Sequence, residues 1–398
     1  MAHSIWRELL RSPPRSLAEA SVRQRLSVPV PADDAAFAAR KGTLKLALRT
    51  TRRALLLQAS GQLHGLQSRL DPAWRRLLWI HEGMPQIGDA LMDLAPRSLL
   101  VERGIHVDLY AGRHIAELFE HDTWFARSCW RAEDVHAADY DAAIVLSHDR
   151  KALRLKRARL PALPWVSLQG FYGGPDFHRA RFATTRLADL LGVTLTPEEH
   201  ARHSAQKLPL SAPAIAQAAA TWTTAWHDAG RTVALALGGV WPQRTYHRWD
   251  ELLARLHARG LRRFVLLGSA NGRALADRLR DSVPDGVELL DRVGSTSLPE
   301  AQALIARCDA AVCADGGLMH LAFATGVPVV ALFNAAIAPQ WRVPVATQGT
   351  ALASPGNEVD EIAPASVAEA VAAAVTASSG AHDAAVAASA HELAATRR

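Results

Sequence analysis

The sequence predicts an α/β protein in which two doubly wound units follow a basic amino-terminal segment. Short apolar runs alternate with helix-like patterns from residue 77 to residue 191, and the same alternation returns from residue 232 to residue 333. Such alternation is typical of βαβ units and of a mainly parallel sheet. The length of 398 residues also suits two or three domains, at about 150 residues per domain.

Positive charge is concentrated in the amino-terminal segment. The whole chain has 45 Lys and Arg against 39 Asp and Glu, but residues 1–76 alone hold 14 basic and 5 acidic residues. The rest of the chain is therefore mildly acidic, so the positive net charge of the whole chain does not describe it. Three cysteines without a C-x-x-C pair cannot build a disulfide framework, and they argue against a zinc site. Together with the lack of a secretory pattern, they favour the cytoplasm.

In the first alternation we expect strands at 77–81, 105–110, 142–147 and 164–168. Helices are expected from Asp89, at 113–120 and at 181–191. Pro96 should kink or restart the first of them, and Gly192 should end the last. Residues 193–230 are helical and polar, and they connect the two units.

In the second alternation we expect strands at 232–237, 263–267, 287–290, 310–314 and 327–333. Helices are expected at 248–259, 298–306, 317–325 and 365–375. One more is expected between Gly272 and about Arg280. The uncharged stretch 316–341 is long enough to cross a bilayer by count. Its glycines and prolines divide it, so we interpret it as buried core.

The basic segment contains one amphipathic pattern, at residues 42–70. Its apolar positions fit a single helical stripe, and they are Leu44, Leu48, Leu55, Ala59, Leu63, Leu66 and Leu70. The simplest interpretation is a helix that packs on the body of the protein. A second is an interfacial helix attracted to anionic lipid. Nucleic-acid binding is the least favoured, because no aromatic residues accompany the arginines.

Ligands of open α/β sheets bind at the carboxyl ends of the strands. At Asp315-Gly316-Gly317 a strand is followed by a glycine turn and a helix, with His320 on its first turn. Exposed N–H groups at such a helix start attract an anion, for which a diphosphate is the natural candidate. The alternative is an ordinary tight turn in which Asp315 caps the helix.

Two further residues could carry chemistry. Asp89 follows the first predicted strand and could be a general base on a substrate hydroxyl, although it could equally be a helix N-cap. Arg244, in the loop after residue 237, could bind phosphate oxygens or be an ordinary surface arginine. The chain has no P-loop lysine motif and no G-x-G-x-x-G, which argues against kinases and dehydrogenases, and it lacks the His-x-Glu-x-x-His string expected of zinc enzymes.

Four of these segments together resemble the heptosyltransferase family, glycosyltransferase family 9. The most diagnostic runs from Asp315-Gly316-Gly317-Leu318-Met319-His320 through Gly326-Val327-Pro328 to Phe333. The others are Ile87-Gly88-Asp89, the segment from Gly238 to Arg244 with Trp241, and Thr296-Ser297-Leu298-Pro299-Glu300. They follow the family's order within residues 77–375.

The resemblance implies a GT-B fold, in which two Rossmann-like domains face each other across a cleft. The chain is then divided into a basic helical extension (1–76), an acceptor-binding domain (77–205), a connection (206–230), a nucleotide-sugar-binding domain (231–376) and a flexible tail (377–398). The implied reaction is a metal-independent, inverting transfer that needs no cofactor, and heptose from ADP-heptose would pass to a lipopolysaccharide-core or other glycan acceptor. The partners are then this donor and a glycan or lipid-linked acceptor. The basic segment 1–76 has no counterpart in the family's usual pattern, and its amphipathic residues 42–70 add the expectation of peripheral contact with an anionic membrane from the cytoplasmic side.

The resemblance also implies roles for individual residues. Asp89 stands where the family has its general base, and Arg244 where it has a phosphate-binding lysine. The residues that correspond to the family's donor site are Thr296, Ser297, Asp315, Gly316, Gly317, Leu318, Met319 and His320. No metal site is implied.

The sequence departs from the family's pattern at several positions. Arg244 replaces a lysine, while Gly316 and Val240 stand where hydroxyl residues are usual, and Asn271-Gly272 replaces a frequent acidic residue. These departures leave other interpretations open: a transferase of another nucleotide sugar or one that acts on protein, an epimerase on the same scaffold, and a non-catalytic nucleotide-sugar-binding protein.

Overall fold

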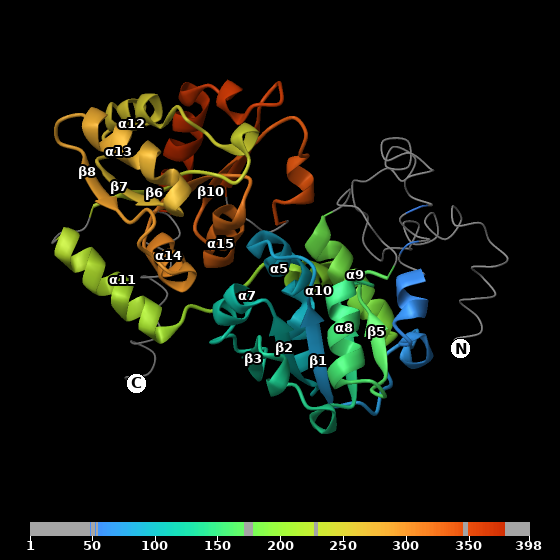
Figure 1. Ribbon diagram of the computed structural model, residues 1–398. Helices are drawn as coiled ribbons and strands as arrows, with labels where there is room; N and C mark the ends of the chain where they lie inside the picture. The colour runs from blue at the N-terminus through green and yellow to red at the C-terminus, as the bar shows by residue number, and fades with distance from the viewer. Residues whose placement is uncertain are drawn as a thin grey trace, which may run out of the picture. The chain divides into compact units, whose positions relative to one another are not determined.

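The computed structural model describes residues 48, 52, 55–170, 178–226, 230–344 and 349–378. The chain forms two compact units, one made of Met1–Pro209 with Gln340–Arg342 and the other of Leu210–Pro339 with Val343–Arg398. Each unit contains one parallel sheet with helices on both faces (Figure 1). The predicted α/β fold with two doubly wound units is therefore confirmed.

The first unit contains a five-stranded sheet with the order β3-β2-β1-β4-β5, in which every pair is parallel. Its strands are β1 (Arg76–His81), β2 (His106–Ala111), β3 (Arg127–Cys129), β4 (Ala142–Val145) and β5 (Trp165–Ser167). The strand order reverses between β1 and β4. Open sheets of this kind bind ligands beside the carboxyl ends of the strands at such a reversal.

The helices of the first unit lie on both faces of this sheet. The α-helices are α5 (Ile87–Asp93), α6 (Ser98–Val101), α7 (Arg113–Leu118), α8 (Arg150–Arg159), α9 (Arg179–Leu191) and α10 (Pro197–Ser204). Short 3-10 turns occupy Ala95–Arg97, Ala132–Asp134 and Ala137–Asp139. Leu78 and Ile80 of β1 pack with α8. Since side chains alternate along a strand, His81 points to the other face, where it contacts Asp93 of α5. Pro96 restarts the helix that begins before Asp89, as predicted.

The prediction of one helix over residues 42–70 is wrong for the part that can be checked. Residues 55–59 are helical, but Gly61 has φ of +68°, a 3-10 turn follows at Leu63–Gly65, and Leu66 forms a bridge with Trp165 beside β5. The left-handed glycine ends the helix. Tertiary contacts override the remaining periodicity, because Leu57 and Leu66 are buried in the core shared with α8. Residues 42–47, 49–51 and 53–54 lie outside the described residues.

A buried lysine ties this segment to α8. The Lys156 ammonium donates to Gln62 Oε1 at 3.0 Å and to the Leu160 carbonyl, and the Gln62 carbonyl accepts from Trp165 Nε1. Lys156 is completely buried. Burial lowers the pKa of Lys156 to about 8, from an ordinary value of 10.5, because the neutral amine is cheaper to bury than the charged form.

We expect Lys156 to make the stability of the first unit depend on alkaline pH. Below pH 8 the folded state carries the full cost of a buried charge, and that cost disappears as pH rises from 8 to 10.5. Urea unfolding should therefore show wild type gaining about 3 kcal/mol over Lys156→Met across this window. If the free energies of unfolding of wild type and Lys156→Met change with pH by the same amount, Lys156 stays charged in the folded state.

The second unit contains a six-stranded parallel sheet with the order β11-β10-β9-β6-β7-β8. Its strands are β6 (Thr232–Ala236), β7 (Arg263–Leu267), β8 (Glu288–Asp291), β9 (Ala310–Ala314), β10 (Val329–Phe333) and β11 (Gly349–Ala353). Counted along the chain, this is the 3-2-1-4-5-6 order of a dinucleotide-binding doubly wound fold. The reversal lies between β6 and β9, so a ligand is expected beside the ends of these two strands.

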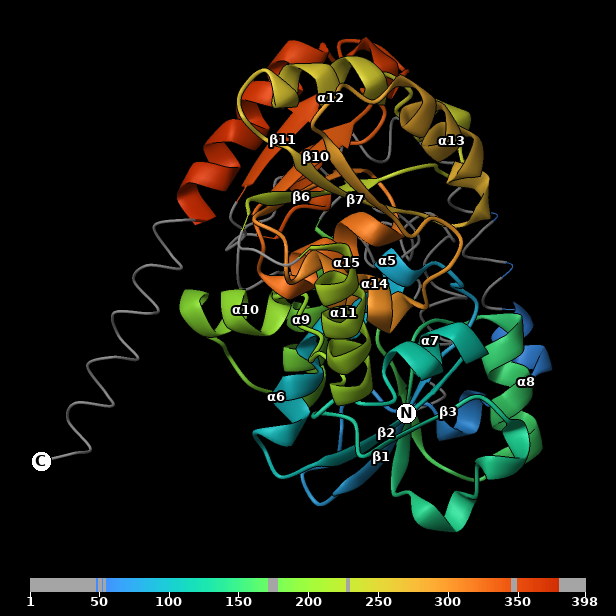
Figure 2. The ribbon, with the colours of Figure 1, turned by 90° about the vertical axis from the view of Figure 1, so that its left-hand side faces the viewer.

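The helices of the second unit divide between the two faces of the sheet (Figures 1 and 2). On one face lie α12 (Trp249–His257), α13 (Arg273–Ser282) and the helical residues 364–378, which share one apolar core. On the other lie α11 (Ala212–Ala225), α14 (Leu298–Ile305) and α15 (Gly317–Thr325), and α14 packs on both of its neighbours. Short 3-10 turns occupy Pro242–Arg244, Ala270–Gly272, Pro339–Trp341 and Val359–Glu361.

The uncharged stretch 316–341 is divided as predicted. Most of α15 and all of β10 within it are buried in the second unit. None of the helices in the described ranges is long and apolar enough to cross a membrane.

Candidate functional site

An ion pair joins the two strand ends at the reversal of the second sheet. Arg244 lies in the 3-10 turn after β6, and its Nη1 is 3.1 Å from Oδ2 of Asp315, the residue that follows β9. The Asp315 side chain is buried, whereas about a third of the Arg244 side chain remains exposed. The pair therefore holds a partly exposed guanidinium at the position where this fold is expected to bind a ligand.

The chain enters α15 directly after Asp315. Gly316, rather than Asp315, is the N-cap residue, and it has an extended backbone and no side chain to cap the helix. The alternative prediction, that Asp315 is only an N-cap, is therefore wrong. The first N–H groups of α15 have no capping side chain, and such groups form an anion-binding position. His320 and Met319 are buried, so Met319 could approach a ligand only through its backbone.

Glycines allow the loops after β6 and β7 to approach each other beside this position. Gly238 has φ of +81°, and a Cβ atom there would lie 2.8 Å from Oδ1 of Asn271. Asn271 Nδ2 in turn donates to the Gly239 carbonyl at 2.8 Å. Asn271, which stands where the family often has an acidic residue, therefore links the two loops. Next to Gly239, Val240 and Trp241 are both exposed.

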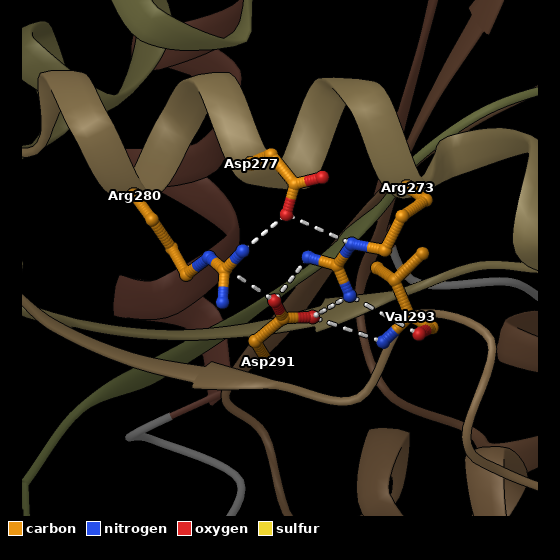
Figure 3. A network of polar contacts seen from close by, with 5 residues as sticks. All are labelled: Arg273, Asp277, Arg280, Asp291 and Val293. Carbon is orange, nitrogen blue, oxygen red and sulfur yellow. Dashed lines mark hydrogen bonds and ion pairs between the residues drawn. The ribbon is translucent and has the colours of Figure 1, made fainter.

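A charge network joins α13 to the end of β8 and to Val293, three residues before Thr296 (Figure 3). Asp291 at the end of β8 accepts from Arg273 and from the Val293 N–H at 3.1 Å, while Asp277 pairs with Arg273 at 3.0 Å and also with Arg280. Burial alone would raise the pKa of Asp291, but the hydrogen bonds from Arg273 and Val293 outweigh it, and this pKa is lowered.

Thr296 and Ser297 themselves are near the start of α14. Ser297 is its N-cap, because its hydroxyl accepts from the Glu300 N–H at 3.3 Å, and Thr296 is half-buried. This capping explains Ser297 without a ligand. No hydrogen bond joins either residue to Arg244 or Asp315 in the described part of the chain.

Asp89 belongs to the first unit and the other predicted site residues belong to the second. Asp89 is the third residue of α5, whose N-cap is Gln86, so the prediction of Asp89 as an N-cap is wrong. Its Oδ1 is 3.0 Å from Arg179 Nη1, and its side chain is 19% exposed. The carboxylate is thus accessible and held by one cation at the carboxyl end of the first sheet.

A buried polar cluster that the sequence did not reveal surrounds this pair. Asp93, one helical turn after Asp89, is completely buried and contacts Arg179, His81 and Gln169. Burial would raise the pKa of Asp93, but the charge of Arg179 and the hydrogen bonds from His81 and Arg179 lower it. One sequence signal was the i, i+4 spacing of Asp89 and Asp93. A second was the arginines near His178, which include Arg179 and which the sequence suggests, with residues 171–174, as lining of an acceptor site; residues 171–174 lie outside the described residues.

Residues 200–368 match the model of glycosyltransferase family 9 (heptosyltransferase). A lipooligosaccharide heptosyltransferase 2 from Haemophilus influenzae is 33% identical over 112 residues, which are 28% of this chain and 31% of that protein. The alignment therefore spans about a third of this relative. The match confirms the predicted family for this region, and with it a domain of glycosyltransferase type.

Solved structures extend the likeness in fold to both units. A family 9 glycosyl transferase from Veillonella parvula has a TM-score of 0.63 and 15% identity, and it covers 77% of this chain and 98% of its own. The E. coli ADP-heptose lps heptosyltransferase II has a TM-score of 0.57 and 19% identity, with coverages of 76% and 98%. At these identities the likeness concerns the fold.

Proposed function

We propose, from the family 9 glycosyltransferase domain at residues 200–368, that the protein transfers a sugar from a nucleoside diphosphate to the hydroxyl of a glycan acceptor. The observation that carries the proposal is the Arg244–Asp315 pair at the strand reversal, beside the uncapped start of α15. A cation and a helix N-terminus at one position suit a leaving diphosphate. We propose ADP-heptose as the donor and a lipopolysaccharide-core or lipid-linked glycan as the acceptor.

The proposed reaction needs one base and a stabilised leaving group. Asp89 would take the proton of the acceptor hydroxyl as its oxygen attacks the anomeric carbon. The bond from that carbon to the diphosphate breaks, and the electron pair leaves with the phosphate oxygen. Arg244 and the N–H groups of Gly316, Gly317 and Leu318 would stabilise the departing charge, with Thr296 and His320 on the nucleotide and sugar. We propose that these groups act without a metal or cofactor.

A donor screen tests the proposal. Titration calorimetry with ADP-, GDP- and UDP-sugars should show binding of an ADP-sugar, and a transfer assay with ADP-heptose and a lipopolysaccharide-core acceptor should yield product. Binding without transfer to glycan or protein would indicate a non-catalytic nucleotide-sugar-binding protein. Binding to none of these donors would contradict the proposal.

Arg244→Met is expected to weaken the binding of the donor about ten- to hundredfold, because hydrogen bonds to charged groups contribute about 1.5–3 kcal/mol. Arg244→Lys restores the charge but not the planar fork, and it should recover part of the affinity. Calorimetry with ADP measures both variants. Arg255→Met, an exposed arginine on α12, is the control. Equal affinity of wild type and Arg244→Met would remove Arg244 from the donor site.

We also propose peripheral contact of the first unit with an anionic membrane on the cytoplasmic side, through residues 42–70. In the described part of this segment, Leu57 and Leu66 share a core with α8. Helix α8 contains no acidic residue. Its exposed residues Arg150, Arg154 and Arg157 lie on one face of the helix. Cations from both elements would then approach the same lipid surface.

Removal of residues 1–54 or the change Arg150→Gln/Arg154→Gln/Arg157→Gln should each reduce sedimentation with vesicles of phosphatidylglycerol and phosphatidylcholine in equal parts. Each surface cation contributes about 1 kcal/mol, so three lost charges predict a partition coefficient about a hundredfold lower. Arg255→Gln/Arg259→Gln/Arg262→Gln removes the same charge from an exposed part of the second unit and should have little effect. Equal losses in the two triple variants would point to net charge rather than to this face.

A further inference from the structure

Arg179 connects the accessible Asp89 to the buried Asp93. Its Nε and Nη2 lie 2.6 Å from the two oxygens of Asp93, and its Nη1 lies 3.0 Å from Oδ1 of Asp89. The two carboxylates are four residues apart on α5, so they share one face of the helix. One guanidinium at the start of α9 thus spans both of them.

The Asp93 side of this arrangement is rigidly held. Asp93 is completely buried and also contacts His81 Nε2 at 3.2 Å and Gln169 Nε2 at 3.1 Å. The two-point contact fixes the plane of the guanidinium as well as its position. Three parts of the first unit, namely the end of β1, α5 and the residues after β5, therefore determine where the third nitrogen of Arg179 lies.

The Asp89 side is open by comparison. Its side chain is 19% exposed, against 0% for Asp93, and the ion pair with Arg179 has its short distance of 3.0 Å at Oδ1. Within the described residues, Oδ2 of Asp89 has no hydrogen bond, and Asp89 has no ion pair except the one with Arg179. A carboxylate that is fixed through one oxygen presents the other in a defined direction.

We propose that Arg179 is a positioning residue for Asp89, anchored by Asp93, so that Oδ2 of Asp89 meets the acceptor hydroxyl. This inference rests on the proposed function, because it gives Asp89 the role of general base. The acceptor proton passes to Oδ2, while Arg179 keeps its contact with Oδ1 and touches no reacting atom. Arg179 also separates the two negative charges of α5. Small misplacements of a reacting group can cost about a hundredfold in rate.

A double-mutant cycle in the transfer assay tests the proposal. Arg179→Met should lower kcat about ten- to hundredfold and leave the KM for the donor nearly unchanged. If Arg179 acts only through Asp89, then Asp89→Asn/Arg179→Met should be no slower than Asp89→Asn alone. Arg179→Lys should recover part of the rate, and Arg113→Met on the surface of α7 should behave as wild type. Losses that multiply in the double variant would overturn the proposal.

Two further comparisons are needed. One shows whether the Arg179→Met protein loses rate only because it misfolds, and the other applies if the protein is not a sugar transferase. Arg179→Met leaves the Asp93 charge buried alone, so Asp93→Asn/Arg179→Met, which removes both charges, should show the same loss of kcat in a more stable protein. Full activity in that variant would also overturn the proposal. If wild type transfers no sugar, the proposed function fails. The coupling of Asp89 and Arg179 in urea unfolding then tests the contact, and additive effects would contradict it.

Discussion

Asp89→Asn is expected to lower the rate of sugar transfer by about 10²- to 10⁴-fold, which is the usual contribution of a positioned general base. Asparagine has nearly the shape of aspartate but cannot take the proton of the acceptor hydroxyl. Donor binding should persist, because the residues proposed to hold the diphosphate belong to the second unit, whereas Asp89 is part of α5 in the first. The measurements are initial rates of transfer and calorimetry with ADP.

Glu117→Gln is the matched control for this prediction. Glu117 is on α7 of the same unit, its side chain is 42% exposed, and it forms an i, i+4 pair with Arg113, so the substitution also removes one carboxylate and one ion pair. Its rate should stay close to that of wild type. If Asp89→Asn transfers sugar at the wild-type rate, Asp89 is not the general base. The resemblance of Ile87-Gly88-Asp89 to the family would then not indicate a catalytic residue.

The interior of both sheets and one edge of each, β5 and β8, could be predicted from the sequence, whereas the other two edges could not. The strand at 310–314 and the helix at 317–325 have the predicted bounds, because apolar runs and glycine turns mark them on both sides. β3 and β11 were missed. Both are edge strands with little burial, so their residues lack the apolar pattern on which the prediction depends. The basic helix α8 was missed as well, since its charges obscure the buried positions Ala152, Leu153 and Leu155.

The candidate site shows the same division between local and distant information. The turn from Asp315 to His320 is contiguous in the chain and could be predicted as a unit. The pairing of Arg244 with Asp315 joins residues 71 positions apart, and that of Asp93 with Arg179 joins residues 86 apart. Such contacts depend on the order of the strands in the sheet. This order cannot be predicted from hydrophobic periodicity in the sequence. The resemblance supplied candidate residues, and the parallel sheets bring two of them together.

Arg97→Met is expected to destabilise the first unit by about 3–5 kcal/mol, because it leaves a buried carboxylate without its cation. Arg97 is completely buried and binds both oxygens of Asp122, and it also donates to the carbonyls of Leu94 and Lys207. Its guanidinium lies 4.6 Å from the ring of Trp124. A loss of this size is a large fraction of the usual stability of a folded domain, about 5–15 kcal/mol, and urea unfolding measures it.

Arg97→Met/Asp122→Asn separates the lost charge pair from lost packing. Removing both charges should recover part of the stability, since burying a neutral pair costs less than burying a single charge. The consequence extends to the candidate base, because the Leu94 carbonyl that Arg97 binds belongs to the C-cap residue of α5, the helix that carries Asp89. Sugar transfer by Arg97→Met should therefore fail at lower temperature than in wild type while its affinity for ADP is kept. Unchanged unfolding in urea would contradict the assignment of Arg97 as the buried cation that holds this end of α5.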